Sequence, residues 1–179
     1  MKHPHHRIAE HDFLWPRTPL NVVLVNPEIP PNTGNIARLC AATGCRLHLV
    51  EPLGFRIDDA RLRRAGLDYW DAIRVELHPD WDSCLRAIAP APGRMHLFST
   101  AGSRRYDRAD YREGDMLVFG CETRGLPDAL LAAHPGAVLG IPIRTDHVRS
   151  LNLSTAVGIA VYHALSALDA AARSPAPLP

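Results

Sequence analysis

The chain has little of several things on which common protein classes depend. Its four cysteines, Cys40, Cys45, Cys84 and Cys121, show no Cys-x-x-Cys spacing. We therefore expect buried or incidental thiols and no structural zinc site. No uninterrupted apolar run is long enough to cross a bilayer, and the N-terminus lacks the basic-then-apolar pattern of a secretory signal. These absences favour a cytoplasmic protein with neither a membrane nor a metal partner.

Lysine is also nearly absent, because Lys2 is the only one, and 20 basic residues against 19 acidic ones give a net charge of +1. A protein that binds nucleic acid usually carries more basic charge, but arginine pairs with phosphate and stacks on bases. A GC-rich genome would also enrich arginine, so local clusters are more informative than the total. Two clusters stand out as candidate nucleic-acid surfaces: Arg61, Arg63 and Arg64, and Arg104, Arg105, Arg108 and Arg112.

Apolar stretches of strand length alternate with stretches of helical pattern along the chain. This alternation predicts an α/β fold with a mainly parallel sheet covered by helices on both faces. We expect a flexible histidine-rich tail over residues 1–19, one domain over 20–170 and a short tail over 171–179. The expected strands are 21–26, 46–51, 73–77, 95–99, 116–120 and 138–141, and the expected helices are 35–43, 58–66, 81–89, 128–133 and 150–169.

The most informative segment is residues 27–39, PEIPPNTGNIARL, which directly follows an apolar run. Prolines stiffen this loop, and Asn32 or Thr33 can cap the helix that follows. The amino end of that helix offers unpaired amide donors to an anion. In a parallel sheet, ligands bind at the carboxyl ends of strands, so we expect Arg38 to face a ligand.

Two further segments repeat this arrangement of a strand followed by a polar turn. Residues 117–127, LVFGCETRGLP, place Glu122 and Arg124 in a turn bracketed by Gly120 and Gly125. Residues 141–154 lead through a polar loop into Arg-Ser-Leu-Asn-Leu-Ser, which opens a long apolar helix. Three such junctions predict loops that converge on one site.

At these three segments the chain resembles the trefoil-knot (SPOUT) RNA methyltransferases, and most of all their TrmL or YibK type, which 2'-O-methylates the wobble nucleotide of certain tRNAs. The resemblance extends to residues 40–44 (CAATG), 48–55 (HLVEPLGF) and 59–69 (DARLRRAGLDY), and covers the chain from about Leu20 to Leu165. Two alternatives remain open. One is 2'-O-methylation of another tRNA or rRNA nucleotide, and the other is a non-catalytic module that binds a nucleotide or RNA.

The resemblance implies a C-terminal knot, S-adenosyl-L-methionine as the cofactor, a homodimer and the anticodon stem-loop of tRNA as the partner. Arg38 matches the family arginine that acts on the ribose hydroxyl, either by stabilising the developing alkoxide beside a phosphate or by accepting its proton with help from that phosphate. Asn35 would orient the hydroxyl or the loop. The implied cofactor-binding residues are Phe98, Gly120, Ile141, Ser150, Leu151, Glu122 and Gly125, and the implied RNA-binding residues are Arg61, Arg63, Arg64, Arg124 and Arg149. Asn152 is expected to cap the final helix.

Overall fold

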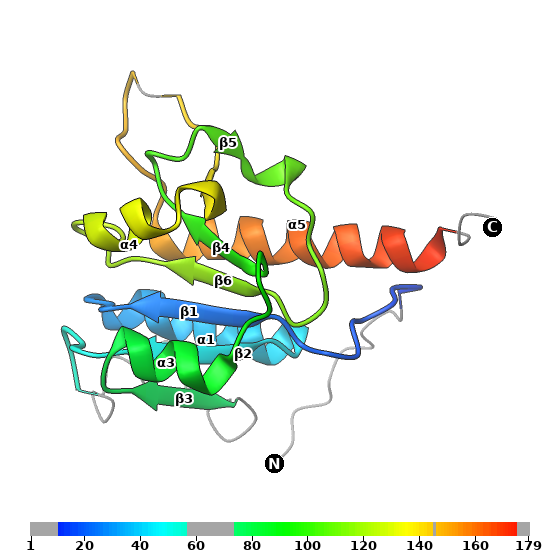
Figure 1. Cartoon of the computed structure of the whole chain (residues 1–179), viewed down its shortest axis with the longest axis horizontal. Helices are drawn as coiled ribbons and strands as arrows, with labels where there is room; N and C mark the ends of the chain where they lie inside the picture. The colour runs from blue at the N-terminus through cyan, green and yellow to red at the C-terminus, as the bar shows by residue number, and fades with distance from the viewer. Residues whose placement is uncertain (1–10, 57–73, 145, 175–179) are drawn as a thin grey trace, which may run out of the picture.

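A computed structural model describes residues 11–56, 74–144 and 146–174 of the chain. The described residues form a sheet of seven strands with helices on both faces (Figure 1). The strands are β1 (Asn21–Val25), β2 (Arg46–Val50), β3 (Val75–His78), β4 (Met95–Phe98), β5 (Arg104–Arg105), β6 (Met116–Phe119) and β7 (Val138–Gly140). The helices are α1 (Pro30–Thr43), α3 (Trp81–Ile88), α4 (Asp128–Ala133) and α5 (Leu153–Arg173), with short 3₁₀ turns η2 (Tyr106–Arg108) and η3 (Pro135–Ala137).

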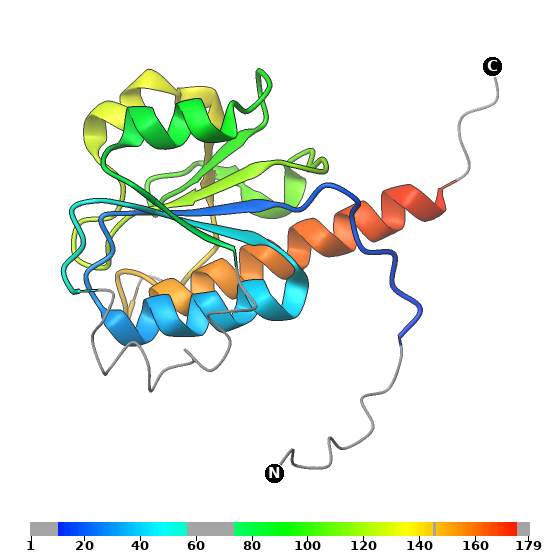
Figure 2. The ribbon, with the colours of Figure 1, turned by 90° about the horizontal axis from the view of Figure 1, so that it is seen from below.

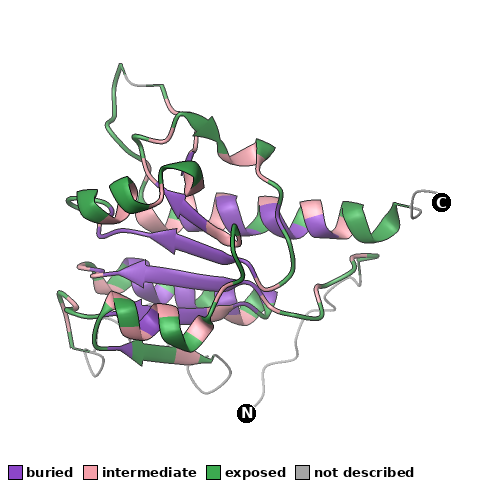
Figure 3. Ribbon diagram, in the orientation of Figure 1, coloured by how far each residue is buried: buried purple, intermediate pink, exposed green. Residues whose placement is uncertain are grey.

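All strand pairs of the sheet are parallel, and their order is β3-β2-β1-β6-β4-β7-β5. Helices α1 and α5 cover one face, and α3 and α4 cover the other (Figure 2). Alternate residues of β1 serve the two layers: Val22 and Leu24 pack toward α1 and α5, whereas Val23 and Val25 pack toward α3 and α4. The central strands are buried from end to end, and the edge strand β3 is partly exposed (Figure 3). The predicted α/β class is confirmed.

Most predicted strands agree with the structure within one or two residues, because continuous apolar runs mark strands buried on both faces. Strand β5 was missed, since its two arginines carry no apolar signal and it exists through pairing with β7. The predicted helix over 58–66 lies outside the described residues. The knot that the resemblance implies stays a prediction.

Helix α1 begins five residues before its predicted start at residue 35. Pro30 and Pro31 occupy its first turn, where a proline needs no hydrogen-bond partner for its nitrogen and its fixed φ already suits a helix. Gly44, with φ of 72°, ends the helix in the left-handed conformation that glycine adopts readily. The stiff loop expected here is therefore largely the first turn of the helix.

Helix α5 begins at Leu153, three residues later than predicted, because Asn152 caps it. The Oδ1 atom of Asn152 accepts hydrogen bonds from the amides of Ser154 and Thr155, which confirms the expected capping role. By length and composition α5 could cross a membrane, with a mean hydropathy of 1.3. Its buried side chains, including Val157, Val161 and Leu165, pack instead into the core, so the resemblance to a membrane span is weak.

The described part of the N-terminal segment is attached to the end of α5. The Leu14 amide donates to Asp169 Oδ1 at 3.0 Å, and the Arg173 guanidinium binds both carboxylate oxygens and the carbonyl of Asp12. Arg173 also binds Asp169 within the helix at 2.7 Å. These bonds connect residues 12–14 to the C-terminal helix.

Candidate functional site

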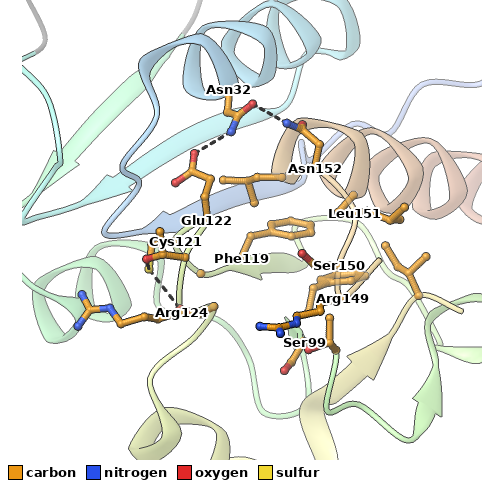
Figure 4. A pocket seen from close by; sticks show the side chains of 18 of the residues that line it. Asn32, Ser99, Phe119, Cys121, Glu122, Arg124, Arg149, Ser150, Leu151 and Asn152 are labelled. Atoms are coloured by element: carbon orange, nitrogen blue, oxygen red, sulfur yellow. Dashed lines mark hydrogen bonds between the residues drawn. The ribbon is translucent and has the colours of Figure 1, made fainter. Parts of the chain in front are cut away.

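A cavity of about 450 Å³ lies where the three predicted junctions meet (Figure 4). It opens at the carboxyl ends of β4, β6 and β7 and at the start of α5. The predicted cofactor-binding residues Phe98, Gly120, Glu122, Gly125, Ile141, Ser150 and Leu151 all line it, as do Arg124 and Arg149. The structure therefore brings together three segments that are far apart in the sequence, as their position after parallel strands predicts.

One wall of the cavity is apolar. The rings of Phe98 and Phe119 stack with their centroids 4.6 Å apart and their planes 13° from parallel. Ile141, Leu151 and Leu153 extend this wall. Cavities of this size and apolar lining hold nucleoside-sized ligands, with a few polar groups to fix their orientation. The residues present therefore fit the adenosine part of S-adenosylmethionine.

Glycine is required in the turn after β6. A Cβ atom on Gly120 would lie 1.9 Å from the backbone carbon of Gly125, which is far inside van der Waals contact. Gly125 has φ of 72°, and its amide donates to the Cys121 carbonyl at 2.9 Å. The turn therefore folds back on itself tightly and presents its backbone to the cavity.

The Glu122 carboxylate lies at the start of α1. It accepts hydrogen bonds from the amides of Glu28 at 2.8 Å and Ile29 at 3.3 Å, and from the Asn32 side-chain amide at 3.0 Å. The prediction that Asn32 or Thr33 caps α1 is wrong, because the helix starts before them at an N-cap, Ile29, with no side-chain cap. The anion expected at this helix end is the chain's own Glu122.

Asn32 continues this connection to the third junction. Its Oδ1 atom accepts a hydrogen bond of 2.9 Å from the Asn152 side-chain amide, while Asn152 Oδ1 caps α5. Glu122, Asn32 and Asn152 thus form one chain of hydrogen bonds that joins the three junctions (Figure 4). The sequence indicated polar residues at every junction, but nothing in their spacing indicated which of them would meet.

The predicted catalytic pair lies outside this cavity. Asn35 and Arg38 are both exposed, and their spacing of three residues places them on one face of α1. Neither lines the cavity within one chain. Arg124 and Arg149 are exposed at its edge, whereas Arg61, Arg63 and Arg64 lie outside the described residues.

The second arginine cluster is partly neutralised by its own loop. Arg105 makes a bidentate pair with Asp107, with N···O distances of 2.9 and 2.6 Å, and Arg112 binds Asp110 at 3.2 Å. Because these guanidinium groups already have carboxylate partners, the cluster is a weaker candidate for phosphate binding than its sequence suggests.

All four cysteines are free and buried, as expected from their spacing. Burial raises the pKa of the Cys40 thiol well above its ordinary value and that of Cys84 to about 12. Buried thiols that hold their protons are poor nucleophiles. Cys40 and Cys84 therefore make poor candidates for covalent catalysis.

Comparisons with known proteins agree with this geometry. A relative from Burkholderia cenocepacia, named tRNA (cytidine(34)-2'-O)-methyltransferase, is 54% identical over 145 residues, which are 80% of this chain and 92% of the relative. A solved structure described as "Structural insights into the 2-OH methylation of C/U34 on tRNA" is 47% identical with a TM-score of 0.76, and covers 82% of this chain and 94% of its own. An AdoMet-bound rRNA methyltransferase from Sinorhizobium meliloti is 28% identical with a TM-score of 0.72, over 84% of this chain and 57% of its own.

The model of the SpoU rRNA Methylase family matches residues 19–162, a stretch that contains all three junctions, the cavity and the first half of α5. Together with the identity to the Burkholderia relative, this match shows that the chain belongs to the SpoU rRNA methylase family.

Proposed function

We propose that this protein transfers a methyl group from S-adenosylmethionine to the ribose 2'-hydroxyl of a tRNA nucleotide, the cytidine or uridine at position 34 of the anticodon loop. The observation that carries the proposal is the cavity, since all seven residues that the resemblance assigns to the cofactor line it. The relatives support the substrate, because one is named for cytidine 34 and one structure is described by methylation of C/U34. The anticodon stem-loop is then the partner, and the cytoplasm the compartment.

When bound, S-adenosylmethionine would supply a methyl group carried on a positively charged sulfur, and this methyl would pass to the ribose oxygen as its bond to sulfur breaks. The chain's part is to bind and orient both reactants and to exclude water. Phe98, Ile141 and Leu151 provide an apolar wall, and the backbone of the Gly120–Gly125 turn provides amide and carbonyl groups. Ser150 stands at the opening, where its hydroxyl can orient a polar end of the ligand.

Arg38 is proposed either to bind the adjacent phosphate and stabilise the negative charge that develops on the ribose oxygen, or to accept the hydroxyl proton with help from that phosphate, and Asn35 to orient the hydroxyl. Their shared face on α1 supports a joint role, because one nucleotide can contact both. Neither side chain lines the cavity of its own chain. The proposal therefore includes a second copy of the chain, so that the two surfaces meet around one nucleotide.

Exposed apolar side chains support this homodimer. Tyr162 on α5 is 51% exposed, and Leu14 and Trp15, in the segment attached to the end of α5, are 45% and 52% exposed. All three lie on α5 or in the segment bonded to its end, and exposed apolar side chains that gather on a surface commonly mark a contact with another chain. The homodimer is tested by analytical ultracentrifugation of the purified protein at micromolar concentration, which measures its mass. A monomer with full activity would contradict the dimer.

The activity is tested by incubating the protein with tRNA and methyl-labelled S-adenosylmethionine, followed by mass spectrometry of the nucleosides. The expected product is a 2'-O-methylated cytidine or uridine. Sequencing of ribonuclease fragments then locates the label, which should be at position 34. A label on another nucleotide would contradict the assignment of position 34 as the substrate. Methylation of a base would contradict the proposed transfer to the ribose hydroxyl.

The role of Arg38 is tested by Arg38→Ala, with Arg86→Ala as the matched control, since Arg86 is an exposed helical arginine outside the residues that line the cavity. Loss of a donor to a developing oxyanion lowers the rate about 10²- to 10³-fold. We expect that loss in the single-turnover rate of Arg38→Ala, with cofactor affinity unchanged and Arg86→Ala unaffected. Equal rates for the two variants would remove Arg38 from the mechanism.

The RNA surface is tested by changing Arg63 and Arg64 together to Ala. Each lost phosphate contact should weaken tRNA binding and lower the slope of log K against log salt by about 0.9 per contact on a duplex stem. Filter binding at several salt concentrations measures both quantities. An unchanged affinity and slope would place the RNA elsewhere.

A further inference from the structure

A group of side chains that could bind a metal ion lies away from the cavity. The group consists of His48 on β2, His78 at the end of β3 and Cys84 on α3, all of them buried. Each residue offers one atom that can bind a metal, and these three atoms lie within 4.8 Å of one another. None of the three lines the cavity. They meet on the face of the sheet that α3 covers, where Cys84 packs with Val23 and Val50.

The hydrogen bonds around His48 determine which of its nitrogens carries the proton. Asn21 donates through its Nδ2 atom to the Gly114 carbonyl at 2.9 Å, which leaves Asn21 Oδ1 to face His48 Nε2 at 3.2 Å. An amide oxygen only accepts, so Nε2 of His48 carries the hydrogen and Nδ1 carries the lone pair. That lone pair points at Nε2 of His78, 3.0 Å away.

The charge state of His48 also suits a side chain that binds a metal ion. Burial lowers its pKa to about 4, so the ring is neutral at pH 7. A carboxylate oxygen of Glu76 lies 3.8 Å from His48 Nδ1, and the Glu76 side chain is 47% exposed. An imidazole whose second nitrogen donates to an oxygen is the arrangement found around histidines that bind metals.

We propose that His48, His78, Cys84 and Glu76 form a binding site for a divalent ion of the zinc type. Bond lengths of about 2.0–2.1 Å to nitrogen and 2.3 Å to sulfur in a tetrahedron require ligand separations of about 3.3 Å between nitrogens and about 3.6 Å between nitrogen and sulfur. The two histidine nitrogens are already 3.0 Å apart, and the sulfur needs an approach of at most about 1.2 Å. Glu76 is not among the three clustered residues, but its half-exposed carboxylate lies 3.8 Å from His48 Nδ1 and turns inward to supply the fourth ligand, which also provides a path of entry.

The protons balance as follows. His48 already presents a lone pair, and His78 moves its hydrogen from Nε2 to Nδ1, which changes no net charge. Cys84 binds as the thiolate and releases one proton to water. Binding therefore releases one proton, and affinity should rise about tenfold per pH unit below the pKa of the free thiol.

The bound ion would connect the edge strand β3 to β2 and α3. Two of its ligands lie on β3, which among the described strands pairs with β2 alone, and a third lies on α3. A ligand that binds only the folded state stabilises it by RT ln(1 + L/Kd), where L is the free ligand concentration, so the effect grows with the logarithm of that concentration above Kd. The site is thus structural in character and separate from methyl transfer.

The test is a titration of the full-length protein with Co²⁺ under reducing, anaerobic conditions. A thiolate bound to Co²⁺ gives a charge-transfer absorption that histidines alone do not give, so the histidine-rich N-terminus cannot imitate it. We expect the band to saturate at one ion per chain in the wild type and in Cys45→Ala, which removes another buried thiol. Cys84→Ala should lose it, and excess Zn²⁺ should displace it.

Thermal unfolding with and without Zn²⁺ provides a second measurement. The midpoint should rise with Zn²⁺ in the wild type and in Cys45→Ala, but not in Cys84→Ala. Absence of the charge-transfer band in folded wild-type protein would overturn the site, as would a band that survives in Cys84→Ala. A Zn²⁺-dependent rise of equal size in Cys84→Ala would assign the effect to other ligands and would also overturn it.

Discussion

Replacing Glu122 with Gln would test whether its carboxylate holds the start of α1 in place. The change conserves shape but turns one of two accepting oxygens into an NH₂ donor. Three donors meet this carboxylate, namely the amides of Glu28 and Ile29 and the side chain of Asn32. Whichever way the new amide turns, at least one of these donors faces another donor.

The cost follows from the bonds that are lost. A hydrogen bond to a charged group contributes about 1.5–3 kcal/mol, and a carboxylate at a helix amino end adds about 0.3–1 kcal/mol. Because Glu122 is only partly buried, we expect a loss of about 2–3 kcal/mol in the free energy of unfolding. For a chain of this size that lowers Tm by roughly 5–10 °C.

Urea unfolding followed by circular dichroism measures the change. Glu28→Gln is the matched control, because the Glu28 carboxylate accepts a hydrogen bond from the Thr123 hydroxyl, an exposed group that can turn to suit an amide. We expect the control to stay within about 0.5 kcal/mol of the wild type. If Glu122→Gln is no less stable than Glu28→Gln, the carboxylate does not hold the helix and the reasoning is refuted.

Three further outcomes are expected. Gly120→Ala should abolish cofactor binding in calorimetry, since its Cβ would overlap Gly125. The control Gly158→Ala, whose Cβ would meet nothing within 4 Å, should bind the cofactor normally and gain about 0.5–1 kcal/mol of stability. Normal binding by folded Gly120→Ala would contradict the proposed role of this turn in the cofactor site. Arg173→Gln should expose the N-terminal segment to trypsin or chymotrypsin, and an unchanged digestion pattern would contradict its attachment. Because hydrogen bonds from Arg173 lower the pKa of Asp12, the same attachment should be present at neutral pH and weaken as the pH falls below about 4, as digestion with an acid-active protease would show.

Much of the fold could be predicted because buried parallel strands are largely apolar. Such runs identify β1, β2, β4 and β6 from the sequence alone. The start of α1 could not be found in this way, since two prolines read as a stiff loop although both suit the first turn of a helix. Strand β5 could not be found either, because its pairing with β7 and not its composition makes it a strand.

The cavity was predictable to the level of its loops. Residues that directly follow parallel strands meet at one edge of the sheet, and glycines and polar residues there mark the loops. The places of Phe98 and Ile141 came from the family resemblance, since each alone suits an ordinary core. The partners of Glu122 were not predictable, because ninety residues of sequence separate it from Asn32 and carry no record of their contact.

The same reasoning applies to the buried histidines. Spacing rules for zinc sites detect ligands that lie close together in sequence, and they found none around the cysteines. His48, His78 and Cys84 come from three elements, so only the folded chain shows them as a group.

The hydrogen bonds that connect Glu122, Asn32 and Asn152 limit how the enzyme can be re-engineered. Suppose that the loop after β6 is replaced by that of a distant homologue so that the enzyme accepts another nucleotide. The new loop must then still provide a side chain that accepts the hydrogen bonds at the start of α1. Exchanging loops one at a time should therefore give poorly folded chimaeras, whereas moving all three as a set preserves their mutual fit.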